Sequence, residues 1–184
     1  MTRHLVVLAG ALSALLASCS KRSPAAPAAS PAPSAATPGA GASLDALDTR
    51  TPLPLLPMMA QHQKQNMRDH LVAVQEIVAA LASDDFAGVE RAAGRIGFSE
   101  EEAQMCGHMG AGGPGFTEQA LAFHHQADKV AAAARDKDRA RVVTELGTTL
   151  KACTACHAIW KQQVVDAATW QRLTAGAPPM QHMH

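Results

Sequence analysis

Residues 151–161, KACTACHAIWK, constrain this chain more than any other stretch, because two cysteines lie three residues apart and a histidine follows the second directly. On a helix, Cys153, Cys156 and His157 are related as i, i+3 and i+4, so their side chains leave the same side. A redox dithiol, half of a zinc site and a covalent haem anchor all use cysteines at this spacing. The surrounding sequence favours one of the three.

The context of the motif fits haem better than its competitors. A thioredoxin-type dithiol has its first cysteine at a helix start after a strand, whereas Cys153 is expected deep inside a helix. Structural zinc requires four ligands, so Cys106 and His108 would have to be recruited from a glycine-rich stretch. Haem c requires two thiols for its vinyl groups and an adjacent imidazole for its iron. We therefore expect one covalent haem c, attached to Cys153 and Cys156 with His157 on the iron.

The chain after about residue 50 has the pattern of an all-α protein. Aromatic residues make up only 3% of the sequence and alanine is frequent, which favours helices over sheets. Helices are predicted at residues 57–81, 85–96, 116–135 and about 139–170. A shorter helix is expected to begin after Ser99 and to end in the glycine-rich loop GHMGAGGPG, and no strand pattern is evident. This arrangement predicts an up-and-down four-helix bundle over residues 51–172.

Two apolar stripes are predicted to face the bundle core. The stripe of the first helix comprises Met67, Leu71, Val74, Val78 and Leu81. The stripe of the last helix comprises Val143, Leu146, Leu150, Cys153, His157, Trp160 and Val164. The haem motif is thus expected on a buried face. His124 and His125 are expected on the polar side of the third helix and at the haem rim, with His62 and His70 at the surface or its boundary.

The N-terminal residues indicate export. A positive start at Arg3 and an apolar run lead into Leu16-Ala17-Ser18-Cys19, which resembles the lipobox of bacterial lipoproteins. Residues 1–18 are therefore predicted to be a lipoprotein signal peptide and Cys19 the lipidated first residue, the alternative being an ordinary signal with an incidental cysteine. Residues 19–50, rich in Ala, Pro and Ser, are predicted to form a tether. We expect a periplasmic, lipid-anchored protein, at the outer rather than the inner membrane because Ser20 follows the cysteine.

Residues 67–163 resemble the class II c-type cytochromes, meaning cytochrome c prime and its low-spin relatives. The resemblance is strongest in residues 115–161, which have a phenylalanine opening the third helix, an alanine-rich body, a short charged turn and the haem motif. Residues 98–115 do not match the family pattern. The resemblance implies a four-helix bundle with haem near its C-terminal end.

The same resemblance implies roles for individual residues. Cys153 and Cys156 correspond to the thioether cysteines and His157 to the proximal iron ligand. Trp160 and Lys161 stand where the family usually has Tyr or Phe followed by Arg, and they are expected beside the haem.

In that family one residue of the first helix faces the other side of the iron. Leu or Phe there leaves the iron open to small gases, whereas Met makes it six-coordinate and suited to electron transfer. Met67 is predicted for this position, because it begins the apolar stripe and falls at the family's spacing, with Met59 and His70 as alternatives. The expected function is therefore one-electron transfer, without enzymatic chemistry. The alternative is a five-coordinate cytochrome that binds NO or CO.

A third hypothesis is a copper-handling lipoprotein. Cys106-Gly107-His108-Met109 and the Met/His tail at residues 173–184 hold soft ligands, although the tail is otherwise expected to be disordered. The formal net charge is zero, which gives no indication of nucleic-acid binding. The expected partners are redox proteins, the membrane through the lipid, and a second copy of the chain through the first helix.

Overall fold

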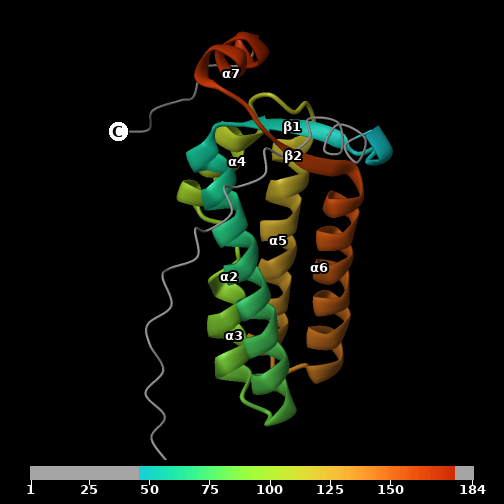
Figure 1. Ribbon diagram of the computed structural model, residues 1–184. Helices are drawn as coiled ribbons and strands as arrows, with labels where there is room; N and C mark the ends of the chain where they lie inside the picture. The colour runs from blue at the N-terminus through green and yellow to red at the C-terminus, as the bar shows by residue number, and fades with distance from the viewer. Residues whose placement is uncertain (1–45, 177–184) are drawn as a thin grey trace, which may run out of the picture. The chain divides into compact units, whose positions relative to one another are not determined.

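The computed structural model describes residues 46–176, which contain six helices and two short strands. In chain order these are β1 (Thr51–Leu55), α2 (Pro57–Ala82), α3 (Phe86–Gly94), α4 (Glu100–Gly110), α5 (Phe116–Arg135), α6 (Arg139–Ile159), β2 (Trp160–Val164) and α7 (Ala167–Thr174) (Figure 1). The predicted signal peptide, Cys19, most of the tether and residues 177–184 of the tail lie outside the described residues. Within residues 46–176, no helix is long and apolar enough to cross a membrane.

The helices begin where the sequence supplies caps. Four side chains accept a hydrogen bond from the backbone amide three residues later, at 2.9, 3.1, 3.0 and 2.7 Å: Asp85, Ser99, Asp138 and Asp166. Such caps each contribute about 1 kcal/mol. Pro57 is the first residue of α2, where a backbone amide makes no hydrogen bond within the helix, so its missing amide hydrogen costs none.

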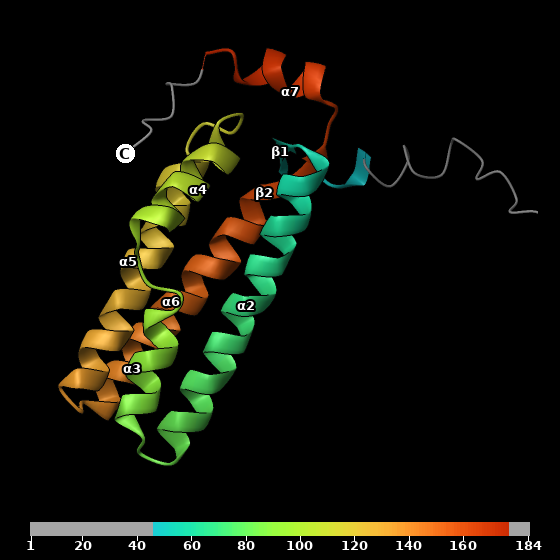
Figure 2. The same cartoon turned by 90° about the vertical axis from the view of Figure 1, so that its left-hand side faces the viewer.

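Four helices run alongside one another, with the strands at one end and the α2–α3 and α5–α6 turns at the other (Figures 1 and 2). Packing is extensive between α2 and α3, between α3 and α5, and between α5 and α6. At the turn end these contacts enclose a core of branched aliphatic side chains and alanines: Ile77, Leu81, Val89, Ala92, Ala93, Val130, Ala131, Ala133, Ala134, Val142 and Leu146. The alanines let the helix backbones approach closely. The mostly helical content agrees with the predicted fold class.

The predicted apolar stripes are only partly buried. On α2, Leu81 is buried, but Met67, Leu71 and Val78 are 40%, 69% and 54% exposed. The buried face of α2 instead contains Ala73, Ile77 and Leu81, because this helix packs mainly against α3.

The stripe predicted on α6 needs a similar correction. Val143 and Leu150 are exposed there, and Val142, Leu146 and Thr149 are buried, since α6 packs mainly against α5.

The end of the last long helix was predicted wrongly. Instead of continuing to about residue 170, α6 stops at Ile159, and β2 pairs in parallel with β1, Thr51 opposite Trp160 and Leu55 opposite Val164. The helix stops because Trp160 takes an extended conformation. Leu53 and Leu55 of β1 are 1% and 0% exposed and pack under this ribbon. The strand pair thereby fixes the chain directly after the haem motif.

The helix after Ser99 ends within the glycine-rich stretch, as predicted. It runs as α4 to Gly110, so the first part of that stretch is helical. At the N-terminal boundary of the domain, Arg50 and Asp48 contact β2, so ordered contacts begin before the predicted boundary at residue 51.

Candidate functional site

The last two turns of α6 carry the motif Cys153, Cys156 and His157. Both cysteines are free and half-buried, and burial raises the pKa of each thiol. His157 is exposed, and its backbone carbonyl accepts a hydrogen bond from Arg50 Nη1 at 3.2 Å. A raised thiol pKa is the opposite of what a redox dithiol requires, so the dithiol interpretation loses support.

All three motif residues line one cavity of about 690 Å³ at the strand end of the helices. Small-molecule and cofactor sites commonly measure about 300–1,000 Å³. The apolar and sulfur-containing side chains of its wall come from both strands and from four helices: Leu53, Met67, Leu71, Val74, Cys106, Met109, Phe116, Ala120, Phe123, Leu150, Cys153, Cys156 and Trp160. Such a wall suits a large, flat and mostly apolar group.

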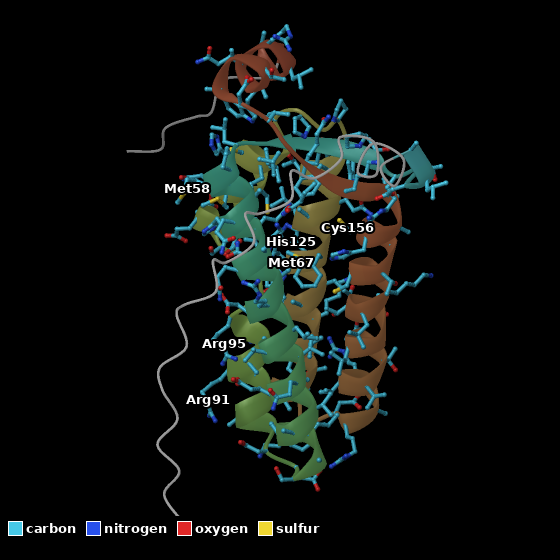
Figure 3. The ribbon with its side chains drawn as sticks, viewed as in Figure 1. Met58, Met67, Arg91, Arg95, His125 and Cys156 are labelled. Atoms are coloured by element: carbon cyan, nitrogen blue, oxygen red, sulfur yellow. The ribbon has the colours of Figure 1, made fainter. Side chains whose placement is uncertain are left out.

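Across this cavity from α6, helix α2 contributes Met67 and His70. Figure 3 labels Met67 on α2 and Cys156 on α6, both in the half of the molecule nearer the strands. The His70 ring stacks on Phe123 with 4.8 Å between ring centroids, and burial together with the charge of His124 lowers its pKa to about 4. Met59, the other predicted alternative, packs among Leu53, Phe116 and their neighbours and is not among the lining residues.

Polar and charged side chains lie at the strand side of the cavity. Trp160 Nε1 donates a hydrogen bond to Gln119 Oε1 at 2.8 Å, and the Trp160 ring meets Phe116 edge to face. Lys161 Nζ donates to the Asp48 carbonyl at 2.7 Å. Trp160 and Lys161 both line the cavity, and Arg50 adds a second cation.

A group that the sequence did not predict lies on the α4–α5 side of the same cavity. One ligand atom each of Glu102, Cys106 and His124 lies within 4.8 Å of the other two. The expectation that His124 covers a polar helix face is wrong, because His124 is 3% exposed. Burial and the charge of Glu102 raise the pKa of Cys106 to about 11. The spacing i, i+4 of Glu102 and Cys106 was visible, but His124 joins them only through tertiary packing.

Of the copper ligands proposed from the sequence, Cys106 and His108 do not lie together, and the Met and His residues of the tail lie outside the described residues. Cys106 and His108 are two residues apart on α4, so their side chains point in different directions. The His108 ring lies against Trp170, with 5.5 Å between centroids. Within residues 46–176, the group of Glu102, Cys106 and His124 is the only one in which three His, Cys or acidic side chains could hold a metal.

Comparisons with known proteins found no relative. A scan against protein-family models, a search of curated proteins and a search of solved structures returned no match. The assignment of function therefore depends on the geometry of the cavity and on the residues that line it.

Proposed function

We propose that this protein binds one haem c and passes single electrons. The observation that carries the proposal is the position of Cys153, Cys156 and His157, which come from one helix end and line one apolar cavity of about 690 Å³. Two thiols and an adjacent imidazole are what covalent haem attachment requires. Bound haem supplies an iron that alternates between two oxidation states.

Each part of the cavity has a role in this proposal. Cys153 and Cys156 hold the haem through thioether bonds, and His157 is the proximal iron ligand. Phe116 and Phe123, which are 6% and 7% exposed, exclude water from the haem face. The helices α2, α3, α5 and α6 act as an up-and-down four-helix bundle, whose rigidity keeps reorganisation small when the iron changes charge.

We assign the second axial position to Met67 of α2. Its thioether lines the cavity opposite α6, and a Met/His pair raises the reduction potential relative to two histidines. His70 is the alternative, since its low pKa keeps it neutral and able to coordinate. Arg50 and Lys161 line the cavity and offer positive charge to the haem carboxylates.

A five-coordinate gas-binding cytochrome is the second candidate. Leu71 and Val74 line the cavity near Met67, and an apolar residue over the iron would leave it open to NO or CO. In this candidate Met67 packs beside the iron without binding it.

The cellular part of the proposal follows the N-terminal sequence. Residues 1–18 direct export, Cys19 carries lipid, and the segment that follows tethers a periplasmic carrier to the membrane, with redox proteins and a second copy of the chain as partners.

The decisive experiment is to produce the full chain with haem-maturation machinery and record oxidised and reduced absorption spectra with and without carbon monoxide. A low-spin spectrum without response to carbon monoxide is the expected result, together with haem that stays attached under denaturing conditions. A high-spin spectrum that shifts with carbon monoxide would select the gas-binding candidate. A chain without covalent haem would contradict both.

A further inference from the structure

The group of Glu102, Cys106 and His124 comes from other helices than the haem motif and lies on the α4–α5 side of the same cavity. Glu102 and Cys106 come from α4 and His124 from α5, and the motif is on α6. Cys106 and His124 are each 3% exposed, whereas the Glu102 side chain is 32% exposed. Two buried ligating groups thus meet one carboxylate that reaches solvent.

The hydrogen bond of His124 determines which of its nitrogens can coordinate. Nδ1 lies 3.0 Å from the Ile96 carbonyl oxygen, which can only accept, so Nδ1 carries the hydrogen. In the neutral ring, Nε2 then has a lone pair, and this atom lies 3.7 Å from Glu102 Oε2. Two acceptors facing each other repel unless a proton on Nε2 or a metal cation lies between them. A backbone carbonyl that orients a histidine in this way is typical of metal ligands.

The ligand types indicate the kind of cation. We propose that Glu102, Cys106 and His124 bind a zinc ion, with a fourth position open to water. Carboxylate oxygen, imidazole nitrogen and thiolate sulfur are the three ligand types that zinc takes in proteins. One carboxylate and one thiolate together balance the charge of a divalent cation. Binding releases the Cys106 thiol proton to solvent.

The distances require little movement. Bonds of about 2.0–2.2 Å place a nitrogen and an oxygen ligand of a tetrahedral zinc ion about 3.3–3.5 Å apart. The 3.7 Å between His124 Nε2 and Glu102 Oε2 is close to this range, and no pair in the group exceeds 4.8 Å. Rotation of the partly exposed Glu102 side chain supplies the remaining adjustment.

Glu102 also lines a second hollow, of about 380 Å³, together with Asp69, Glu76, Arg95 and others. Three carboxylates against one guanidinium give this hollow an excess of negative charge, which attracts a cation.

The test uses the haem-loaded full chain, in which thioether bonds remove Cys153 and Cys156 as competing thiols. Metals are first removed with a chelator, zinc is added, and zinc per protein chain and zinc affinity are measured by chelator competition. X-ray absorption at the zinc edge, which is blind to iron, then reports the ligands. We expect one tightly bound zinc per chain with one sulfur, near 2.3 Å as for Cys-bound zinc, and nitrogen or oxygen otherwise.

Matched variants locate the ion. Glu102→Gln, Cys106→Ser and His124→Gln are each expected to weaken zinc binding by at least about tenfold. Glu101→Gln and His125→Gln, which make the same changes one residue away at more exposed positions, are expected to retain it. Because Glu102 is partly exposed, Glu102→Gln should fold normally even if a buried variant does not, and thermal unfolding checks this.

Two results would overturn the proposal. One is a zinc shell without sulfur. The other is equal zinc affinity in the Glu102→Gln and Glu101→Gln variants, which would mean that zinc binds elsewhere, for example in the histidine-containing tail. Haem attachment is read separately from the absorption spectrum, so failure of the zinc site and failure of the haem proposal are distinguishable.

Discussion

At the scale of single residues, the residue across the iron of the proposed haem would separate an electron carrier from a gas binder. Met67 is 40% exposed and lines the cavity, whereas Met59 is 9% exposed and packs in the cluster beneath the strands. Met59 and Met67, eight residues apart on α2, therefore have different surroundings. Their substitution should have different consequences.

We predict that Met67→Ala converts the haem-loaded protein from low spin to a high-spin form that binds carbon monoxide, because the sixth iron ligand is lost. The free energy of unfolding of the haem-free chain should change little, since this side chain is largely exposed. Met59→Ala is the matched control, expected to keep the low-spin spectrum but to lower the free energy of unfolding by about 2–4 kcal/mol. If the Met67→Ala variant stays low-spin, His70 becomes the candidate for the sixth iron ligand, and the absorption spectrum of His70→Gln would test it.

Gly113 and Gly147 differ in how closely other atoms surround them. A Cβ atom at Gly113 would meet Leu53 Cδ1 at 2.5 Å and a Trp160 ring carbon at 3.2 Å. At Gly147, in the middle of α6, nothing lies within 4 Å. We predict that Gly113→Ala lowers the free energy of unfolding by about 1–3 kcal/mol through overpacking, whereas Gly147→Ala raises it by about 0.5–1 kcal/mol through helix propensity.

Denaturant unfolding of both glycine variants tests this contrast. Equal stability of the two would show that the contact between the α4–α5 connection and β1 is looser than the distances indicate.

At the scale of elements, the start of α6 depends on one side chain. Asp138 accepts a hydrogen bond from the Arg141 amide at 3.0 Å, and this satisfies one of the free amides of the first turn. We predict that Asp138→Ala lowers the free energy of unfolding by about 1 kcal/mol and that Asp138→Asn restores most of it, because asparagine caps equally well. Urea denaturation followed by circular dichroism measures the free energy of unfolding of both variants. An equal decrease in the two would mean that the charge of Asp138, and not its capping hydrogen bond, stabilises the helix.

The elements also show which parts of the fold could be predicted from the sequence. The bounds of α5 were predicted correctly, because Gly115 precedes it and a charged turn follows it. The end of α6 was not, since β2 forms only by pairing with β1, a segment far away in the chain. A contact of that kind leaves no periodic signal, and the prolines of β1 further obscure its strand character.

The candidate site likewise has one part that the sequence predicts and one part that it does not. The shared direction of Cys153, Cys156 and His157 follows from their spacing on one helix, and these residues do line one cavity. The meeting of His124 with Glu102 and Cys106 depends on how α4 packs on α5, which the sequence pattern does not specify. The sequence therefore predicts the geometry of residues on one helix, but it does not predict which helices pack together.

At the scale of the whole molecule, the N-terminal sequence predicts attachment to a membrane. Replacing Cys19 by Ser removes the thiol that would be lipidated. We predict that the wild-type chain sediments with membranes after cell lysis and that Cys19→Ser moves the haem-loaded protein to the soluble periplasmic fraction, with an unchanged spectrum. Retention of the variant in the membrane fraction would indicate that an uncleaved signal segment, and not a lipid, holds the protein.

The cavity also bears on the stability of the whole domain. Several apolar side chains that line it are largely exposed, among them Met67, Leu71 and Leu150 at 40%, 69% and 42%. A covalently held apolar group that covers them would stabilise the folded state, because apolar surface removed from water contributes about 25 cal/mol per Å². Exposed apolar surface of this extent otherwise favours association.

We therefore predict that haem-loaded protein unfolds at a temperature higher by at least about 10 °C than the Cys153→Ala/Cys156→Ala double variant produced without covalent haem. Differential scanning calorimetry of both gives the comparison. The double variant should also bind a fluorescent apolar dye more strongly than the haem-loaded protein does. Equal unfolding temperatures with and without haem would mean that the group lies outside the apolar walls, and the cavity would then not be the haem site.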